Sequence, residues 1–158
     1  MFARIQTFIV AFALVFGLGT SAQASDTVLT VKHKDQTLTF DRAALEALGT
    51  ETVETTTIWT EGTQVFEGVS LARLAQEIGA QEGRFLATAI NDYTVEIPQS
   101  DAVENGPILA MTINGNEMSV RDKGPLWVIY PYDANAGYRT EVIYSRSIWQ
   151  LDRIEVVE

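Results

Sequence analysis

The sequence predicts an α+β fold in which strands dominate, arranged as a mixed sheet or barrel with a few short helices. Short segments rich in β-branched and aromatic residues recur from residue 27 onward, separated by turn-forming Gly, Asn, Asp and Pro. Two segments, 42–48 and 71–78, combine apolar residues at helical spacing with a capping residue. No low-complexity tract, second apolar segment or internal repeat divides the chain, so residues 25–158 are predicted to form a single domain.

The first 24 residues are typical of a secretory signal peptide. Arg4 is their only charge, the apolar run 8–18 follows it, and Ala22-Gln23-Ala24 supplies a cleavage site with small residues. The apolar run is about half of the roughly 20 residues that a membrane-spanning helix needs. We therefore expect cleavage after Ala24 and a periplasmic protein, with an uncleaved N-terminal anchor as the alternative.

The first half of the domain alternates strands and capped helices. Residues 27–32 are expected to pair with 36–40 across a turn at 33–35, which places His33 at the surface. Asp41 is expected to cap a helix that Gly49 ends, and Ser70 a helix that Gly79 ends. Between these helices, the threonine-rich segment Val53–Trp59 and the segment Gln64–Phe66 are predicted strands.

Strands return in the second half. Asn91-Asp92 is a turn-forming pair between two apolar strands, Asn114-Gly115 is a strong hairpin signal, and Pro98 opens a short helix through Val103. The type of the last segment, 148–157, stays open. The strands predicted here are 85–90, 93–97, 108–113, 117–120 and 126–130.

Composition excludes several function classes. The 158 residues carry a net charge of −10, which disfavours nucleic acid as a partner. The chain has no cysteine and one histidine, so thiolate sites, cysteine nucleophiles and Ser–His–acid catalysis are excluded, and a zinc or copper site is not expected. Nothing singles out a catalytic carboxylate pair among the 21 acidic residues. The sequence therefore favours binding over catalysis, with no metal and no catalytic cofactor.

Trp59-Thr60-Glu61 is the most informative triplet. At the end of the predicted strand, Trp59 and Glu61 would point to the same face. An indole beside a carboxylate suits a flat, nitrogen-rich heterocycle such as a pterin or guanine. The ring stacks, and the 2-amino group and ring N3–H donate two parallel hydrogen bonds to the carboxylate. The alternative is a core tryptophan beside a solvated glutamate in a turn.

Two further groups combine polar and aromatic residues. Asn91, Asp92 and Tyr93 lie in a turn between strands, where binding groups are common, although turn chemistry alone also explains the first two. Four of the five tyrosines fall between residues 130 and 144, close to Arg146 and Trp149. This concentration suggests a recognition surface, or alternatively an aromatic core with surface ion pairs.

Four stretches together resemble the sulfite-oxidase-type molybdopterin-binding domain. FEGVSLARL after Trp59 is similar to its W-x-G-V-x-L-x-x-L-L element, and NDYTVEIP to its D-G-Y-x-x-x-I-P element. GPLWVIYP resembles its G-P-x-R-L-V-x-P strand, and SRSIW its closing S-x-K-W segment. The stretches keep the family order, so the resemblance implies this fold for most of the domain. They occupy residues 66–74, 91–98, 124–131 and 145–149.

One departure from that family bears on function. Its molybdenum enzymes ligate the metal through a cysteine at the end of the strand before the G-V-x-L helix, where this chain has Trp59 and Glu61. The combination resembles small, exported pterin-binding regulators of the PruR type, which carry W-x-E there. That resemblance implies a free, reduced pterin as ligand. It also implies as partner the periplasmic domain of an inner-membrane diguanylate cyclase/phosphodiesterase, which makes and degrades cyclic di-GMP.

The sequence therefore predicts a periplasmic pterin sensor that regulates this enzyme. Its rivals are an oxidoreductase-like protein that holds the molybdopterin cofactor without a cysteine ligand, and an interaction module whose pocket is filled. In the predicted sensor, the Trp59 indole packs on the pterin ring, and the Glu61 carboxylate accepts hydrogen bonds from the 2-amino group and N3–H of the pterin. The 91–93 turn completes the wall of the pocket. Arg146 and one aromatic residue contact the side chain of the ligand. These predicted binding residues are Trp59, Glu61, Asn91, Asp92, Tyr93, Arg146 and either Tyr132 or Trp149.

Overall fold

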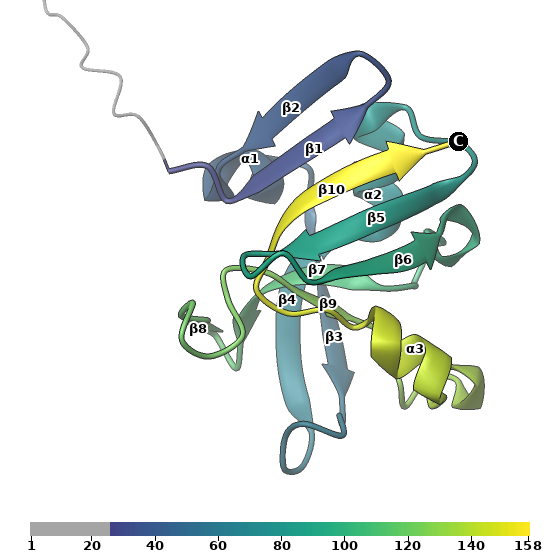
Figure 1. Cartoon of the computed structure of the whole chain (residues 1–158). Coiled ribbons are helices and arrows are strands. Elements are labelled where there is room, and N and C mark those ends of the chain that lie inside the picture. Colours follow the sequence, from purple (N-terminus) through teal and green to yellow (C-terminus); the bar gives the residue numbers. More distant parts are fainter. Residues whose placement is uncertain (1–25) are drawn as a thin grey trace, which may run out of the picture.

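The strands form two open five-stranded sheets in the computed structural model, which describes residues 26–158 (Figure 1). Three short α-helices accompany the ten strands, so the predicted strand-dominated α+β class is confirmed. Within residues 26–158 the sheets do not close into a barrel, because β2 and β6 remain unpaired edge strands. The predicted signal peptide lies outside the described residues. No helix of the described chain is both long and apolar enough to cross a membrane.

The first sheet has the strand order β2-β1-β10-β5-β6. The chain begins it with the predicted 27–40 hairpin and completes it with its last strand, which lies parallel to β1 and antiparallel to β5. The end of the chain is thus a central strand, which settles the type of the segment that the sequence left open. The bounds are β1 Leu29–His33, β2 Gln36–Phe40, β5 Arg84–Ala89, β6 Thr94–Pro98 and β10 Leu151–Val157.

The second sheet is centred on β7. Strand β4 pairs with one edge of β7, and β8 and β9 pair with the two ends of the other edge. Strands β3 and β4 form a long hairpin that projects away from the first sheet (Figure 1). The bounds are β3 Thr50–Thr55, β4 Gln64–Ser70, β7 Ile108–Ile113, β8 Asn116–Glu117 and β9 Trp127–Ile129.

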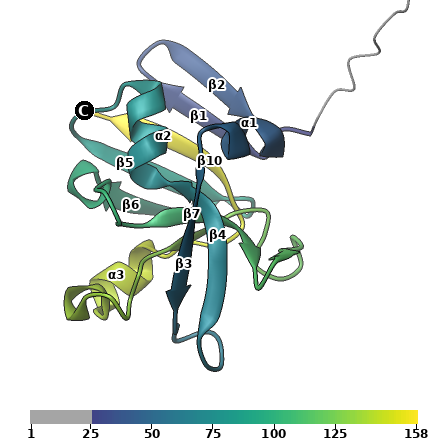
Figure 2. The ribbon, with the colours of Figure 1, turned by 180° about the vertical axis from the view of Figure 1, so that it is seen from behind.

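Two of the three α-helices have the predicted positions and caps. Asp41 caps α1 (Arg42–Ala47), and Ser70 caps α2 (Leu71–Ile78), which ends at Gly79 in the left-handed conformation. Both helices lie on the same side of the first sheet (Figure 2). His33 was expected at the surface in a turn, but it is the last residue of β1 and is buried, with its Nδ1 2.8 Å from the carbonyl oxygen of Ile78. A 3₁₀ turn, Gln99–Asp101, replaces the short helix predicted after Pro98.

The third helix, α3 (Glu141–Arg146), was not predicted. Thr140 caps it, but Ile143 is its only buried residue, so the segment carries no apolar period that a sequence could reveal. A second 3₁₀ turn, Ala136–Tyr138, precedes it. The helix contacts β6 and leads directly into the segment before β10.

The predicted strand Val53–Trp59 is wrong in its second half. Strand β3 ends at Thr55, and residues 56–63 form a loop to β4. Asp133 ends the strand. Its carboxylate accepts hydrogen bonds from the backbone N–H of Thr56 (2.6 Å) and from the Thr56 hydroxyl (2.8 Å). Its own N–H donates to the Thr55 hydroxyl. These contacts replace the next ladder hydrogen bonds and turn the chain away from the sheet.

Candidate functional site

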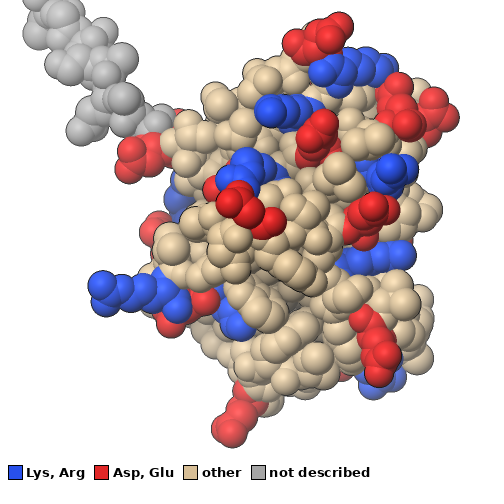
Figure 3. Space-filling view, in the orientation of Figure 1, with Lys and Arg blue, Asp and Glu red and all other residues tan. Residues whose placement is uncertain are grey.

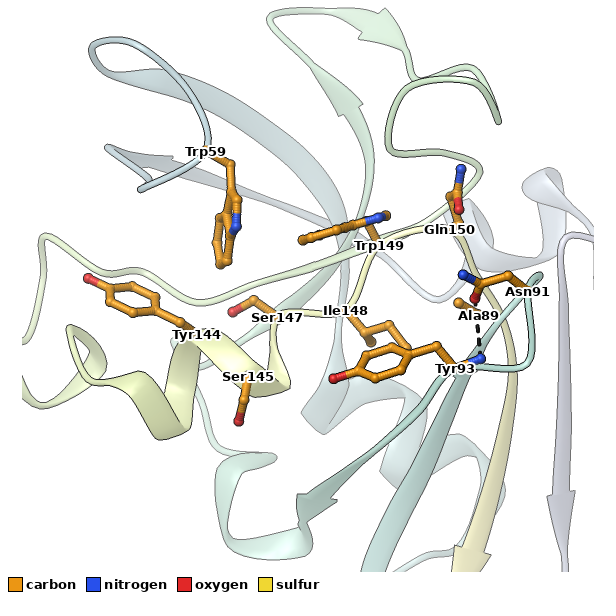
Figure 4. A pocket seen from close by; sticks show the side chains of 10 residues that line it. All are labelled: Trp59, Ala89, Asn91, Tyr93, Tyr144, Ser145, Ser147, Ile148, Trp149 and Gln150. Carbon is orange, nitrogen blue, oxygen red and sulfur yellow. Dashed lines mark hydrogen bonds between the residues drawn. The ribbon is translucent and has the colours of Figure 1, made fainter.

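A cavity of about 370 Å³ opens where three parts of the chain meet (Figure 4). The β3–β4 loop contributes one wall, the β5–β6 turn a second, and the segment from α3 to β10 the third. The lining side chains are all uncharged, and four of them are aromatic. They are Trp59, Ala89, Asn91, Tyr93, Tyr144, Ser145, Ser147, Ile148, Trp149 and Gln150.

Trp59 stands at the centre of an aromatic cluster. Its ring meets those of Trp127, Tyr132, Tyr144 and Trp149 in edge-to-face geometry, with centroid separations of 5.7, 6.3, 5.8 and 5.9 Å. Edge-to-face pairs at such distances each contribute about 0.5–1.5 kcal/mol beyond area burial. The loop that carries Trp59 is irregular, but these contacts hold its indole in one place beside the cavity.

The segment before β10 is held in an irregular conformation from both sides. Gln150 has a φ of +53°, a backbone state uncommon for residues other than glycine. Its N–H donates to the carbonyl of Lys123 (2.9 Å), and its carbonyl accepts from the N–H of Ile90 (2.9 Å). These hydrogen bonds fix the neighbouring Trp149, whose ring is 37% exposed and lines the cavity.

The β5–β6 turn supplies a polar and an aromatic group. The Asn91 side-chain oxygen accepts the N–H of Tyr93 (3.2 Å), and the Tyr93 ring is 58% exposed at the cavity. Asp92 lies between them with a φ of +67°, and its carboxylate pairs with Arg153 on β10. Asp92 therefore holds the turn to the sheet and does not line the cavity.

The structure brings together four of the predicted binding residues, Trp59, Asn91, Tyr93 and Trp149. Glu61 is exposed in the β3–β4 loop and is not a lining residue. The prediction placed it beside Trp59 because alternate residues of a strand share a face. Since the strand ends at Thr55, that geometric reason is wrong.

Tyr132 and Arg146 are near the cavity but turned to other partners. Tyr132 is buried behind Trp59, where its hydroxyl donates to the Ser147 hydroxyl (2.7 Å), and burial raises the pKa of Tyr132 to about 12. The Arg146 guanidinium donates to the Asp101 carboxylate (2.9 Å), which also accepts the Tyr130 hydroxyl (2.7 Å). Arg146 thus anchors α3 and leaves the cavity without a positive charge.

Six lining residues were not among the predicted set. Tyr144 belongs to the tyrosine-rich region that the sequence did single out, and 144–149 is a continuous polar and aromatic run. That run was a usable signal, but it did not show which side chains face inward, since α3 was not foreseen. The six are Ala89, Tyr144, Ser145, Ser147, Ile148 and Gln150.

Several polar groups at the cavity are available to a ligand. Within residues 26–158, no protein partner binds the side-chain nitrogen of Asn91, the hydroxyls of Tyr93 and Tyr144, or the indole N–H groups of Trp59 and Trp149. Trp127, in contrast, donates its indole N–H to the carbonyl of Ser147. The cavity therefore combines aromatic surfaces with unpaired donors, a combination found in sites for small molecules.

Two comparisons with known proteins found no match. No protein-family model matches the chain, and no curated protein matches it. In the part of the chain that the structure describes, no group of three or more His, Asp or Glu side chains could hold a metal ion.

Proposed function

We propose that this protein binds a free, reduced pterin in the cavity and acts as a periplasmic sensor without turnover. The observation that carries the proposal is the cavity itself: about 370 Å³, uncharged, with four aromatic side chains and unpaired N–H and O–H groups at its wall. This volume is at the low end of the range of about 300–1,000 Å³ for small-molecule sites. A bicyclic ring with a short side chain suits such a site.

The resemblance supports the same ligand. Three of the four stretches similar to the sulfite-oxidase-type domain supply or adjoin lining residues: Trp59 before the first, Asn91 and Tyr93 in the second, and 145–149 in the fourth. Segments far apart in sequence thus meet at one cavity. We take the specific fold of that domain as part of the proposal.

The uncharged lining favours a free pterin over the whole molybdopterin cofactor. The cofactor carries a phosphate, which proteins bind through Arg, Lys or clustered backbone N–H groups. Arg146, the cation expected to meet an anionic side chain, is paired with Asp101. The rival oxidoreductase reading therefore gains no support from the residues at this cavity.

The regulatory half of the proposal rests on the surface around the cavity. Exposed apolar residues lie on the same three segments that line it: Ile58 (61% exposed) in the β3–β4 loop, Ile90 (42%) in the β5–β6 turn and Val142 (56%) on α3. A partner that binds these segments would sense whether the cavity is filled. We propose that this partner is the periplasmic domain of the membrane-bound cyclic di-GMP enzyme.

Calorimetric titration with 7,8-dihydroneopterin and with oxidised neopterin tests whether the protein binds a pterin and which redox state it prefers. We expect 7,8-dihydroneopterin to bind the wild-type protein and Tyr93→Ala to weaken binding by about tenfold, because an aromatic ring stacked on a base contributes roughly 1–3 kcal/mol. Tyr93→Phe keeps the ring and should retain most of the affinity. Since Tyr93 is exposed, neither change should affect folding.

Glu61→Ala, in the same titration, tests whether Glu61 binds the ligand, as the sequence predicted, or lies outside the site, as the lining of the cavity indicates. A tenfold loss would return Glu61 to the site and require the 56–63 loop to move. Unchanged affinity would leave the lining residues as the whole site. If neither dihydroneopterin nor oxidised neopterin binds at millimolar concentration, the proposed function is wrong.

A further inference from the structure

A lysine stacks on Trp149, one of the two tryptophans that line the cavity. The Nζ atom of Lys123 lies 3.7 Å from the ring centroid of Trp149 and 5.4 Å from that of Trp127. Within residues 26–158 the Lys123 ammonium has no carboxylate partner. Its close neighbours are therefore two indole rings, and the first distance is well inside the range of about 6 Å for a cation–π interaction.

The backbone holds Lys123 in this position. It lies in a turn closed by hydrogen bonds from the N–H groups of Asp122 and Gly124 to the carbonyl of Ser119 (3.0 and 2.9 Å). The carbonyl of Lys123 itself accepts the N–H of Gln150, the residue after Trp149. The cation and the indole are thus carried by two segments that are bonded directly to each other.

The ammonium contacts a ring that lines the cavity without lining the cavity itself. Trp149 is a lining residue and Lys123 is not. Figure 4 shows the Trp149 ring nearly edge-on, with one face directed toward Ile148 and Tyr93. A ligand between Trp149 and Tyr93 would meet that face.

We propose that Lys123 covers the face of Trp149 opposite the cavity and is a positioning and specificity-determining residue, which fixes the indole and makes its cavity face prefer electron-rich ligand rings. The face of an indole carries negative potential, which attracts a cation and repels the face of another electron-rich ring. A cation on the outer face draws that potential outward and reduces the repulsion on the inner face. The preference for a reduced pterin rests on the proposed function.

The surroundings of Lys123 strengthen this effect. The side chain is half-buried, and burial lowers the pKa of Lys123 below its usual 10.5, because the ammonium loses hydration without gaining a carboxylate. A cation–π interaction is stronger when the cation is desolvated. An ordinary lysine that only covers apolar surface with its aliphatic stem would not depend on the charge. The two roles therefore predict different results for a neutral side chain of the same length.

The test compares Lys123→Met, which keeps the stem and removes the charge, with Lys123→Arg, which keeps a cation. We expect Lys123→Met to weaken 7,8-dihydroneopterin binding by about threefold to thirtyfold, with a smaller loss for oxidised neopterin, and Lys123→Arg to stay within about threefold of wild type. In the ligand-free protein, the indole N–H resonance of Trp149, assigned with Trp149→Phe, should shift in Lys123→Met. Thermal unfolding checks that both variants fold.

The outcomes separate this inference from the proposed function. If the wild type binds both pterins equally, or Lys123→Met weakens both equally, the specificity role is overturned while pterin binding stands. If the Trp149 resonance is unmoved in Lys123→Met, the positioning role is overturned without reference to any ligand. If the wild type binds neither pterin, the proposed function fails with the specificity role, and the resonance alone decides whether Lys123 positions Trp149.

Discussion

The position of Trp59 depends on other aromatic side chains. Trp59 lies in the β3–β4 loop, outside any strand, and four edge-to-face ring contacts hold its indole beside the cavity. These contacts come from Trp127, Tyr132, Tyr144 and Trp149, which lie far from Trp59 along the chain.

Gly68 is required by the close approach of two strands. A Cβ atom at this position on β4 would lie 2.0 Å from the carbonyl oxygen of Leu109 on β7, at the point where the register shifts. We expect Gly68→Ala to destabilise the protein by at least about 3 kcal/mol, measured by urea unfolding, because backbone cannot move aside as a side chain can. Gly137→Ala is the matched control, since its nearest contact is the Asn135 side-chain oxygen at 3.2 Å. Similar stabilities for the two variants would contradict this account.

Tyr132 should make the protein sensitive to alkaline pH. Burial raises its pKa from 10.0 to about 12, so the folded state favours the neutral phenol. The resulting stability is complete below pH 10 and is lost as the pH rises toward 12. We expect a late step in phenolate absorbance near pH 12, accompanied by unfolding, and a smaller step in Tyr132→Phe, in which Tyr130, whose pKa burial also raises, still ionises on unfolding. Tyr93→Phe, at an exposed ring, should leave the late step unchanged; a step of undiminished size in Tyr132→Phe would assign it elsewhere.

At the level of elements, the β3–β4 loop depends on a contact with a distant segment. Asp133, between β9 and α3, accepts two hydrogen bonds from Thr56 at the start of the loop that carries Trp59. Within the loop, the Thr57 hydroxyl accepts the N–H of Trp59 (3.0 Å) and meets the Thr60 hydroxyl (2.8 Å). The threonine-rich sequence predicted that the strand continues to Trp59. The hydrogen bonds within the loop and to the Asp133 carboxylate instead hold residues 56–60 in a turn.

Asp133→Asn should therefore loosen this loop. The hydrogen bonds from Thr56 hold the pKa of Asp133 below its usual 3.8, so its contribution is present above that pH and is lost as the pH falls through the lowered value. We expect amide hydrogen exchange at Thr56 to become about tenfold faster in Asp133→Asn at neutral pH, with the difference shrinking in acid. Asp35→Asn in the β1–β2 turn makes the same change of charge and should leave that exchange rate unaltered. Equal rates in both variants would show that Asp133 does not anchor the loop.

Helix α3 could not be predicted from the sequence, because the contacts that hold it join residues far apart along the chain. Helix α3 has a capping threonine and an acidic first turn, but only one buried residue. Its attachment comes from the Arg146–Asp101 ion pair and the Tyr130 hydroxyl. Pairs between residues 45 or 29 positions apart leave no periodic signal in a sequence.

For the whole molecule, the distribution of charge refines what net charge suggests. The chain carries −10, yet acidic and basic side chains are interspersed over the first sheet on the face that Figure 3 shows. Ion pairs such as Arg84 with Glu96 and Lys34 with Glu158 account for part of this mixture. A partner recognised by charge alone would find no single acidic surface on that face, so the exposed apolar residues of the segments that line the cavity are the better candidate contact.

Elements whose causes are local could be predicted from the amino-acid sequence. Hairpins at 29–40 and 108–117, the two capped helices and the turn at Asn91-Asp92 follow from turn residues, caps and alternation within a few positions. The aromatic residues of the site were likewise predictable from residue types, but its lack of charge was not, because Glu61, Asp92 and Arg146 were expected to bind the ligand. Where β3 ends, that Arg146 pairs with Asp101, and that Lys123 lies over Trp149 could be learned only from the packed molecule. Each of these depends on a hydrogen bond, ion pair or ring contact between distant residues, whose free energy exists only after the two sheets have packed.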